Sequence, residues 1–397
     1  MTFSTNEKKE NYFLSQVHQP FFVLGVFSAI IMMLIFALSY KGIVSLEMDS
    51  LLFHVYSLIF ILFSNVFTGF LFTTFPRFCQ SELVEKTYYK KLFFATALGV
   101  VIFLLGAFIN LQLLIVGMIV LFISQVFMFL KLQTMYKNGT TEDREDPFWI
   151  LMAHKFGLFG HFLFILSMFD LGVDDFAINI SFYMYLIFLT FSVGQRMIPF
   201  FSHSIEAKDE RFITTVFILF ILKTVLTLFD TYTFVAITEI IIDILLGLYL
   251  LGEFLNWKLS PRQSLPIVWV LQLGLFWLPV AFIASGITLA LELLLDVDFY
   301  FLGMHLIALG FLTTILIGFG TRVTLGHSGQ APNADKLDIS LFYFTQVVVL
   351  MRAIYSMNYA FDWKLNFLFD ISFSLWLLLF LVWSARYAKV LIFGTKL

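Results

Sequence analysis

Seven histidines are the residues of this chain best suited to chemistry, and four of them lie inside long apolar segments: His54, His154, His161 and His305. His54 lies about three residues inside segment 51–75, and His305 about five residues inside segment 300–320; at about 1.5 Å of helical rise per residue, their imidazoles are predicted at similar depths. An ionisable side chain is costly to bury in lipid and usually has a function there. This matched pair is therefore the first candidate site.

Two imidazoles at one depth on two helices suit the two axial positions of a heme iron. Each Nε2 would bind one face of the metal, with the planar macrocycle standing between the helices. Gly69 and Gly310 lie on the same two segments, where they would let a backbone or the macrocycle approach closely. We therefore predict heme b bound by His54 and His305, with Gly69 and Gly310 beside it.

The third intramembrane position is His161, near the middle of segment 148–169 and next to Gly157 and Gly160. His154 precedes it by one heptad. The sequence leaves three roles open for His161: a ligand of a second metal, a member of a polar relay, or a packed neutral residue. The other histidines, His18, His203 and His327, fall in loop segments, where a histidine is usually solvated.

The segments that carry these residues are predicted to be membrane-spanning helices. Hydrophobic residues make up 60% of the 397 residues, charged residues only 13%, and the mean hydropathy is +0.93, whereas a soluble domain has roughly 25% charged residues. The apolar runs are long and continuous without alternation, which favours helices over strands. We expect an all-α polytopic fold with lipid as its solvent and spans at 20–40, 51–75, 92–110, 112–130, 148–169, 176–197, 212–229, 233–252, 267–290, 300–320, 340–358 and 366–388.

Basic residues are distributed unequally between the two ends of these spans. Of 24 Lys and Arg, all but five fall on one side, which includes Lys8 and Lys9; the exceptions are Lys41 and Lys364 on the other side and Lys155, Lys223 and Arg352 inside spans. We call the first side the basic side. The other is the acidic side, because its loops carry Asp170, Asp174, Asp175, Asp230, Glu292, Asp296 and Asp298.

The positive-inside rule places the basic side, with both termini, in the cytoplasm. His54 and His305 then lie in the outer third of the membrane. The predicted organisation is a cytoplasmic arm at 1–19, one twelve-helix domain at 20–390 and a tail at 391–397. The arm mixes Lys and Glu and has no cleavage pattern, so we interpret it as soluble rather than as a signal peptide.

The sequence contains none of the common motifs for other kinds of chemistry. Cys79 is the only cysteine, which excludes a disulfide or a CxxC pair within the chain. No basic tract suggests nucleic acid as a partner, and the chain has no Walker loop, HExxH or ordered Ser-His-Asp set. The sequence assigns no catalytic residue.

A short internal sequence similarity relates the second, sixth and tenth spans. The second contains TGFLFTT and the tenth GFLTT, and each of the three spans ends near an arginine: Arg77, Arg196 and Arg322. The spacing of four spans suggests three pseudo-symmetric four-helix units. Arg196 and Arg322 are interpreted as interface anchors or, with His203 and His327, as a cytoplasmic anion pocket.

Buried charges form the remaining group of candidates. We predict that Arg352 pairs with a carboxylate such as Asp243 or Glu239, or with a heme propionate. Asp243 and Glu239 lie four residues apart on one face of segment 233–252. They could form part of a proton path or of a salt-bridged core.

Several of these segments resemble the NnrS family of polytopic membrane proteins. The resemblance rests on residues 18–22 (HQPFF), 68–76 (TGFLFTTFP), 194–201 (GQRMIPFF) and 321–330 (TRVTLGHSGQ). It implies a heme- and copper-associated protein of the bacterial cytoplasmic membrane, linked to nitric oxide metabolism and resistance to nitrosative stress. The chain departs from the family's His-x-His-Glu pattern, because His54 is followed by Val55, Tyr56 and Ser57. This departure weakens the case for copper there.

The chain is also distantly similar to the catalytic subunit of heme-copper oxidases, which has twelve spans in three four-helix arcs. His54 and His305 look like the ligands of the oxidase low-spin heme in the second and tenth spans. The sixth and seventh spans lack the histidines that would hold the oxidase copper. The resemblance therefore implies electron transfer or diatomic-ligand binding rather than chemistry at a heme-copper pair.

Two functions from different classes remain. The first is a b-type heme protein for nitric oxide tolerance, with a quinol or cytochrome as redox partner and nitric oxide or another diatomic molecule as ligand. The second is a twelve-helix transporter of a small solute, in which His161, Lys155, Lys223, Asp243 and Arg352 would line a central path.

Overall fold

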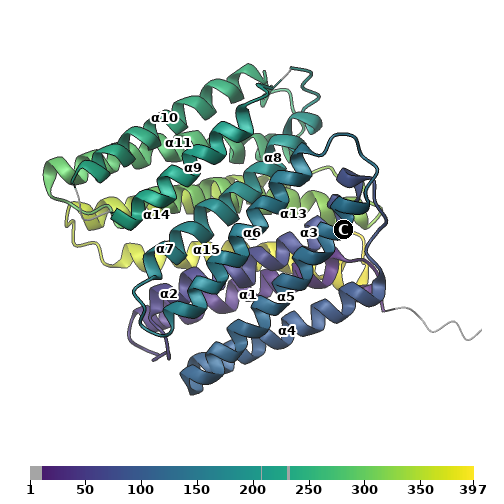
Figure 1. Ribbon diagram of the computed structural model, residues 1–397, viewed down its shortest axis with the longest axis horizontal. Coiled ribbons are helices and arrows are strands. Elements are labelled where there is room, and N and C mark those ends of the chain that lie inside the picture. The colour runs from purple at the N-terminus through teal and green to yellow at the C-terminus, as the bar shows by residue number, and fades with distance from the viewer. Residues whose placement is uncertain (1–10, 207, 230–232) are drawn as a thin grey trace, which may run out of the picture. The chain divides into compact units, whose positions relative to one another are not determined.

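The computed structural model describes residues 11–206, 208–229 and 233–397, and throughout these ranges the chain forms helices and loops without a β-strand (Figure 1). Twelve helices are long and apolar enough to cross a membrane, which confirms the predicted number of spans. The protein is therefore a multi-pass membrane protein. Lys8, Lys9 and Asp230, used above to define the two sides, lie outside the described residues.

Contacts divide the chain into two compact units. Unit 1 covers described residues 11–147 and 384–397, and unit 2 covers residues 148–383. Unit 1 contains η1 (Tyr12–Leu14), α1 (His18–Tyr40), α2 (Ser50–Tyr56), η2 (Ser57–Phe63), α3 (Ser64–Cys79), α4 (Lys86–Ile109) and α5 (Leu111–Asn138). Unit 2 contains most of α6 (Glu145–Ser167), α7 (Asp174–Asn179), η3 (Ile180–Ile187), α8 (Phe188–Phe201), α9 (Phe212–Leu226), η4 (Thr227–Phe229), α10 (Thr233–Asn256), α11 (Pro266–Leu295), α12 (Leu302–His305), η5 (Leu306–Thr313), α13 (Thr314–His327), α14 (Lys336–Ala360) and most of α15 (Phe367–Phe393).

Small residues set the helix packing of unit 1. The hairpin of α4 and α5, seen side by side in Figure 1, turns at Asn110, whose side chain accepts the N–H of Leu113 at 2.8 Å. An added Cβ at Gly106 would lie 2.1 Å from the backbone nitrogen of Leu114. Close contact of this kind drives helix association in membranes, because lipid supplies no hydrophobic force between apolar helices.

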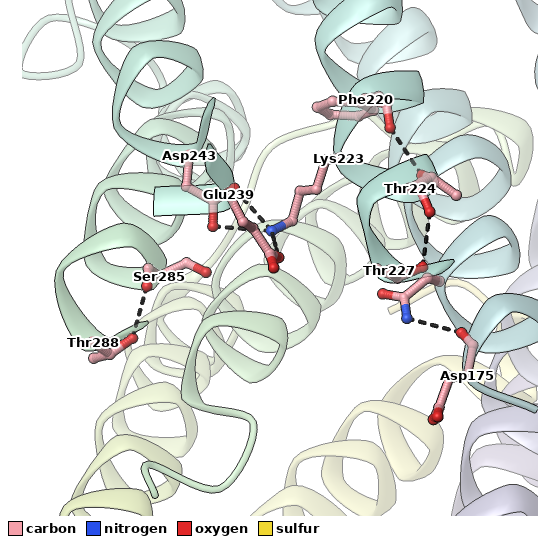
Figure 2. A network of polar contacts seen from close by, with 10 residues as sticks. Asp175, Phe220, Lys223, Thr224, Thr227, Glu239, Asp243, Ser285 and Thr288 are labelled. Atoms are coloured by element: carbon pink, nitrogen blue, oxygen red, sulfur yellow. Dashed lines mark hydrogen bonds and ion pairs between the residues drawn. The ribbon is translucent and has the colours of Figure 1, made fainter. Parts of the chain in front are cut away.

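In unit 2, glycines likewise allow α10 and α11 to pack closely against each other. An added Cβ at Gly247 would lie 2.9 Å from the carbonyl oxygen of Pro279, and one at Gly286 would lie 3.1 Å from that of Ile240. These two glycines hold α10 close to α11. This contact brings the acidic face of α10 next to Ser285 of α11 (Figure 2).

Three spans contain a π-helical stretch, and they are the second, sixth and tenth. The stretches are η2, η3 and η5, all buried over most of their length. In two of them a hydroxyl side chain stabilises the wider turn: Ser64 donates to Ile59, and Thr313 donates to Ala308, each five residues back. π-Helical turns are rare and often lie at functional sites, so they mark the spans that carry His54 and His305.

Candidate functional site

His305 lies where α12 passes into η5. Its Nδ1 is 2.9 Å from the carbonyl oxygen of Phe301, one turn earlier in the chain. When Nδ1 carries the proton and donates to this carbonyl, Nε2 keeps its lone pair for a metal. A second hydrogen bond of this kind is the usual support of a metal-bound imidazole, so His305 fits the role of an axial ligand.

Arg352 of α14 contacts the same imidazole. Its Nη2 lies 3.1 Å from Nδ1 of His305 and 3.0 Å from the carbonyl oxygen of Tyr300, and its Nη1 donates to Ser356. A guanidinium group can only donate, so a bond from Arg352 to Nδ1 would move the imidazole proton to Nε2 and block metal binding. Arg352 and Phe301 therefore compete for Nδ1, and their balance sets the tautomer of His305.

His54 lies in unit 1, three residues before η2. Its ring stacks on Phe36 of α1, with ring centroids 4.2 Å apart and planes at 28°. Its backbone carbonyl accepts the hydroxyl of Ser57 at 3.1 Å. His54 and His305 belong to different units, and the binding of one heme between them stays a prediction.

Gly69 and Gly310, expected to let a backbone or the macrocycle approach closely, both have protein atoms close to them. An added Cβ at Gly69 would lie 3.1 Å from the backbone of His18, so this glycine brings α3 close to α1. One at Gly310 would lie 2.7 Å from the indole ring of Trp277. Both positions are explained by close packing, a role that the sequence alone could not separate from cofactor contact.

Lys223, Glu239 and Asp243 form a second polar cluster, which we call the Lys223 triad (Figure 2). Nζ of Lys223 lies 2.7 Å from Glu239 Oε1, and 2.9 and 3.0 Å from the two carboxylate oxygens of Asp243. The side chains of Lys223 and Asp243 are 2% and 0% exposed, and that of Glu239 is 25% exposed. Nζ also lies 5.0 Å from the ring centroid of Tyr183 in η3.

The triad replaces one predicted pairing. The sequence suggested that Asp243 or Glu239 would neutralise Arg352, whereas the structure gives both carboxylates to Lys223. The physical reason is the order of the helices, since α9 and α10 are consecutive and pack against each other. A signal was present in the sequence: one lysine in the seventh span and two carboxylates in the eighth.

His161 and His154 lie on the face of α6 that packs against the span containing η3. They are 1% and 0% exposed. Added Cβ atoms at Gly157 and Gly160 would lie 2.5 Å from the Tyr185 ring and 2.2 Å from the Ser181 hydroxyl. Across the part of the chain that the structure describes, no three or more His, Cys, Asp or Glu side chains gather where they could hold a metal ion. Metal binding at His161 stays a prediction.

Comparison with known families decides which proteins this chain is related to. The family model described as "NnrS protein" matches residues 12–393, nearly the whole chain. The chain belongs to the NnrS family. No curated protein matches it.

The family match includes both units and every candidate residue of this NnrS protein, from His54 to Arg352. Membership therefore confirms the resemblance drawn from the short segments. The match concerns descent and fold, and the ligands of any heme or copper must be argued from the residues themselves.

The remaining candidates of this NnrS protein differ in exposure. His18, expected to be solvated, is the first residue of α1 and only 2% exposed, so that expectation is wrong. It is buried because Gly69 brings α3 against it. His203 is exposed, as expected. The guanidinium of Arg322 lies 3.9 Å from the ring centroid of Phe201.

Proposed function

We propose that this NnrS protein is an integral membrane b-type heme protein that serves nitric oxide tolerance. We place it in the bacterial cytoplasmic membrane with both termini in the cytoplasm, as the distribution of Lys and Arg favours. The observation that carries the proposal is the Nδ1 contact of His305 with the Phe301 carbonyl, which, with the proton on Nδ1, would leave the Nε2 lone pair for a metal.

The residues around His305 would have distinct tasks. The Phe301 carbonyl would hold the His305 ring in the metal-binding tautomer. With its Nη2 hydrogen-bonded to the Tyr300 carbonyl instead of to His305, Arg352 would offer a buried positive charge to a heme propionate. When bound, heme supplies a one-electron redox centre or a site for a diatomic ligand. With His54 as a second axial ligand the iron would be six-coordinate, which favours electron transfer from a quinol or cytochrome partner.

The first experiment is an absorption spectrum of the purified protein, oxidised and dithionite-reduced, with a pyridine hemochrome assay. We expect b-type bands at about one heme per chain, lost or shifted in His54→Ala and His305→Ala. His203→Asn is the control, because His203 is exposed and has a positive φ of 54°, which Asn tolerates. Full heme retention in both alanine variants would contradict the assignment.

Copper is a separate part of the proposal, because the chain lacks the second His and the Glu of the family's His-x-His-Glu pattern after His54. We expect metal analysis of the purified protein to find iron with little copper. Copper in equal amount, retained after dialysis against a chelator, would contradict this expectation.

A transporter is the second candidate, and the buried Lys223 triad is the observation that favours it. Lys155, the other lysine placed inside a predicted span, is exposed and does not line an interior path. A colourless protein expressed with ample heme would move the assignment to this class.

A further inference from the structure

The Lys223 triad contains two carboxylates and one cation. With all three groups ionised it would hold one excess negative charge inside a membrane-spanning bundle, where unpaired charge is strongly disfavoured. We propose that Glu239 is a reversible proton-binding site, which takes a proton from the acidic side while Lys223 and Asp243 remain an ion pair. This inference does not depend on heme.

Asp243 is the better partner of Lys223. Both of its carboxylate oxygens lie within 3.0 Å of Nζ of Lys223. A fully buried carboxylate that contacts a cation with both oxygens is stabilised in its ionised form. Protonating Asp243 would break this pair, so the proton is expected elsewhere.

Glu239 meets the requirements of a proton acceptor. One of its oxygens contacts Lys223 at 2.7 Å, and its side chain keeps 25% exposure. It lies one helical turn nearer than Asp243 to Thr233, where α10 begins on the acidic side. A proton arriving from hydronium would bind the Glu239 carboxylate and leave water, with no electron transferred.

The elements packed around Glu239 contribute few other charges. The two charged neighbours of Glu239 in the triad are Lys223 of α9 and Asp243 of α10. The Tyr183 ring of η3 lies next to Lys223. Glu292 of α11 interacts electrostatically with Glu239, and its Oε1 accepts the N–H of Phe299 at 2.8 Å. This second carboxylate lies near the acidic end of α11, on the side from which the proton would arrive.

The test is infrared spectroscopy of the full-length protein in nanodiscs, in water and in D₂O, over a pH series. A protonated carboxyl gives a carbonyl stretching band that shifts in D₂O. We expect this band in the wild type, its loss at high pH, its absence in Glu239→Gln and its retention in the matched control Glu292→Gln. In Lys223→Met the band is expected to double in intensity, because both carboxyls would then bind a proton.

Two results would overturn the proposal: no such band in the wild type, or an unchanged band in Glu239→Gln. Asp243→Asn also leaves one carboxylate with one cation, so its band is expected to be lost as well. Glu239→Asp keeps the charge and therefore decides which of the two carboxyls carries the proton. A band at a shifted frequency in that variant supports Glu239 as the proton site, and an unshifted band overturns it.

Discussion

Unit 2 buries two cations, Lys223 and Arg352, in different surroundings. Lys223 faces two carboxylates within 3.0 Å. Arg352 donates to the Ser356 hydroxyl and the Tyr300 carbonyl, contacts Nδ1 of His305, and lies 5.1 Å from the ring centroid of Tyr355. The difference separates a cluster with surplus negative charge, suited to a proton, from a cation that contacts the proposed ligand of the heme.

The largest effect is expected from Lys223→Ala, which leaves two carboxylates without their cation. Removing one partner of a buried ion pair costs about 3–5 kcal/mol of folding free energy. A thermal melt followed by size-exclusion chromatography should show a strong loss of folded protein. The control removes all three charges (Lys223→Leu, Glu239→Gln, Asp243→Asn) and should recover most of the stability; equal loss in both variants would show that the ion pair is not the cause.

Arg352→Ala should act on heme more than on folding. It removes the cation proposed for a heme propionate, and a hydrogen bond to a charged group contributes about 1.5–3 kcal/mol, so heme titration should show a dissociation constant raised about 10- to 100-fold. Arg352→Lys keeps the charge but lacks the planar guanidinium, so its heme dissociation constant should lie between those of the wild type and Arg352→Ala. Unchanged heme affinity in Arg352→Ala would separate Arg352 from the His305 site.

Gly310→Ala tests how firmly η5, and with it His305, is packed. The new methyl would lie 2.7 Å from the Trp277 ring, whose Nε1 donates to Gln346 at 2.6 Å. Overpacking of this kind should lower stability by about 1–2 kcal/mol. Gly326→Ala is the control, since an added Cβ there has nothing within 4 Å; equal melting temperatures for the two variants would argue against a tight contact.

Ser285→Ala is the smallest change. It removes the hydroxyl that lies next to the Asp243 carboxylate (Figure 2) and should cost at most about 1 kcal/mol in a thermal melt. It should also raise the pH at which the infrared carboxyl band of unit 2 disappears, because a less stabilised Asp243 binds a proton more readily. A band that disappears at the wild-type pH would show that Ser285 does not stabilise the charged form.

The predicted spans agree with the observed helices in number and order, and differ mainly at their ends. The fourth span was predicted to end at 130, whereas α5 continues to Asn138 and includes Lys131 and Lys137. Hydropathy detects only the part of a helix that lies in hydrocarbon, while backbone hydrogen bonds extend the helix into the polar interface.

The sequence by itself determined that this chain is a helical membrane protein, because length, apolarity and charge asymmetry leave no other solvent or element type. Its short motifs indicated the NnrS family, and the family match confirms it. The sequence also placed Lys223, Asp243 and Arg352 inside spans, and all three are buried. It did not predict that His18 is buried or that Lys155 is exposed.

Only the tertiary structure decided that Lys223 rather than Arg352 holds Asp243, that Gly69 and Gly310 are filled by protein, and that Arg352 contacts His305. These facts depend on the rotation of each helix about its own axis and on which helices are its neighbours. The hydropathy pattern contains little information on either.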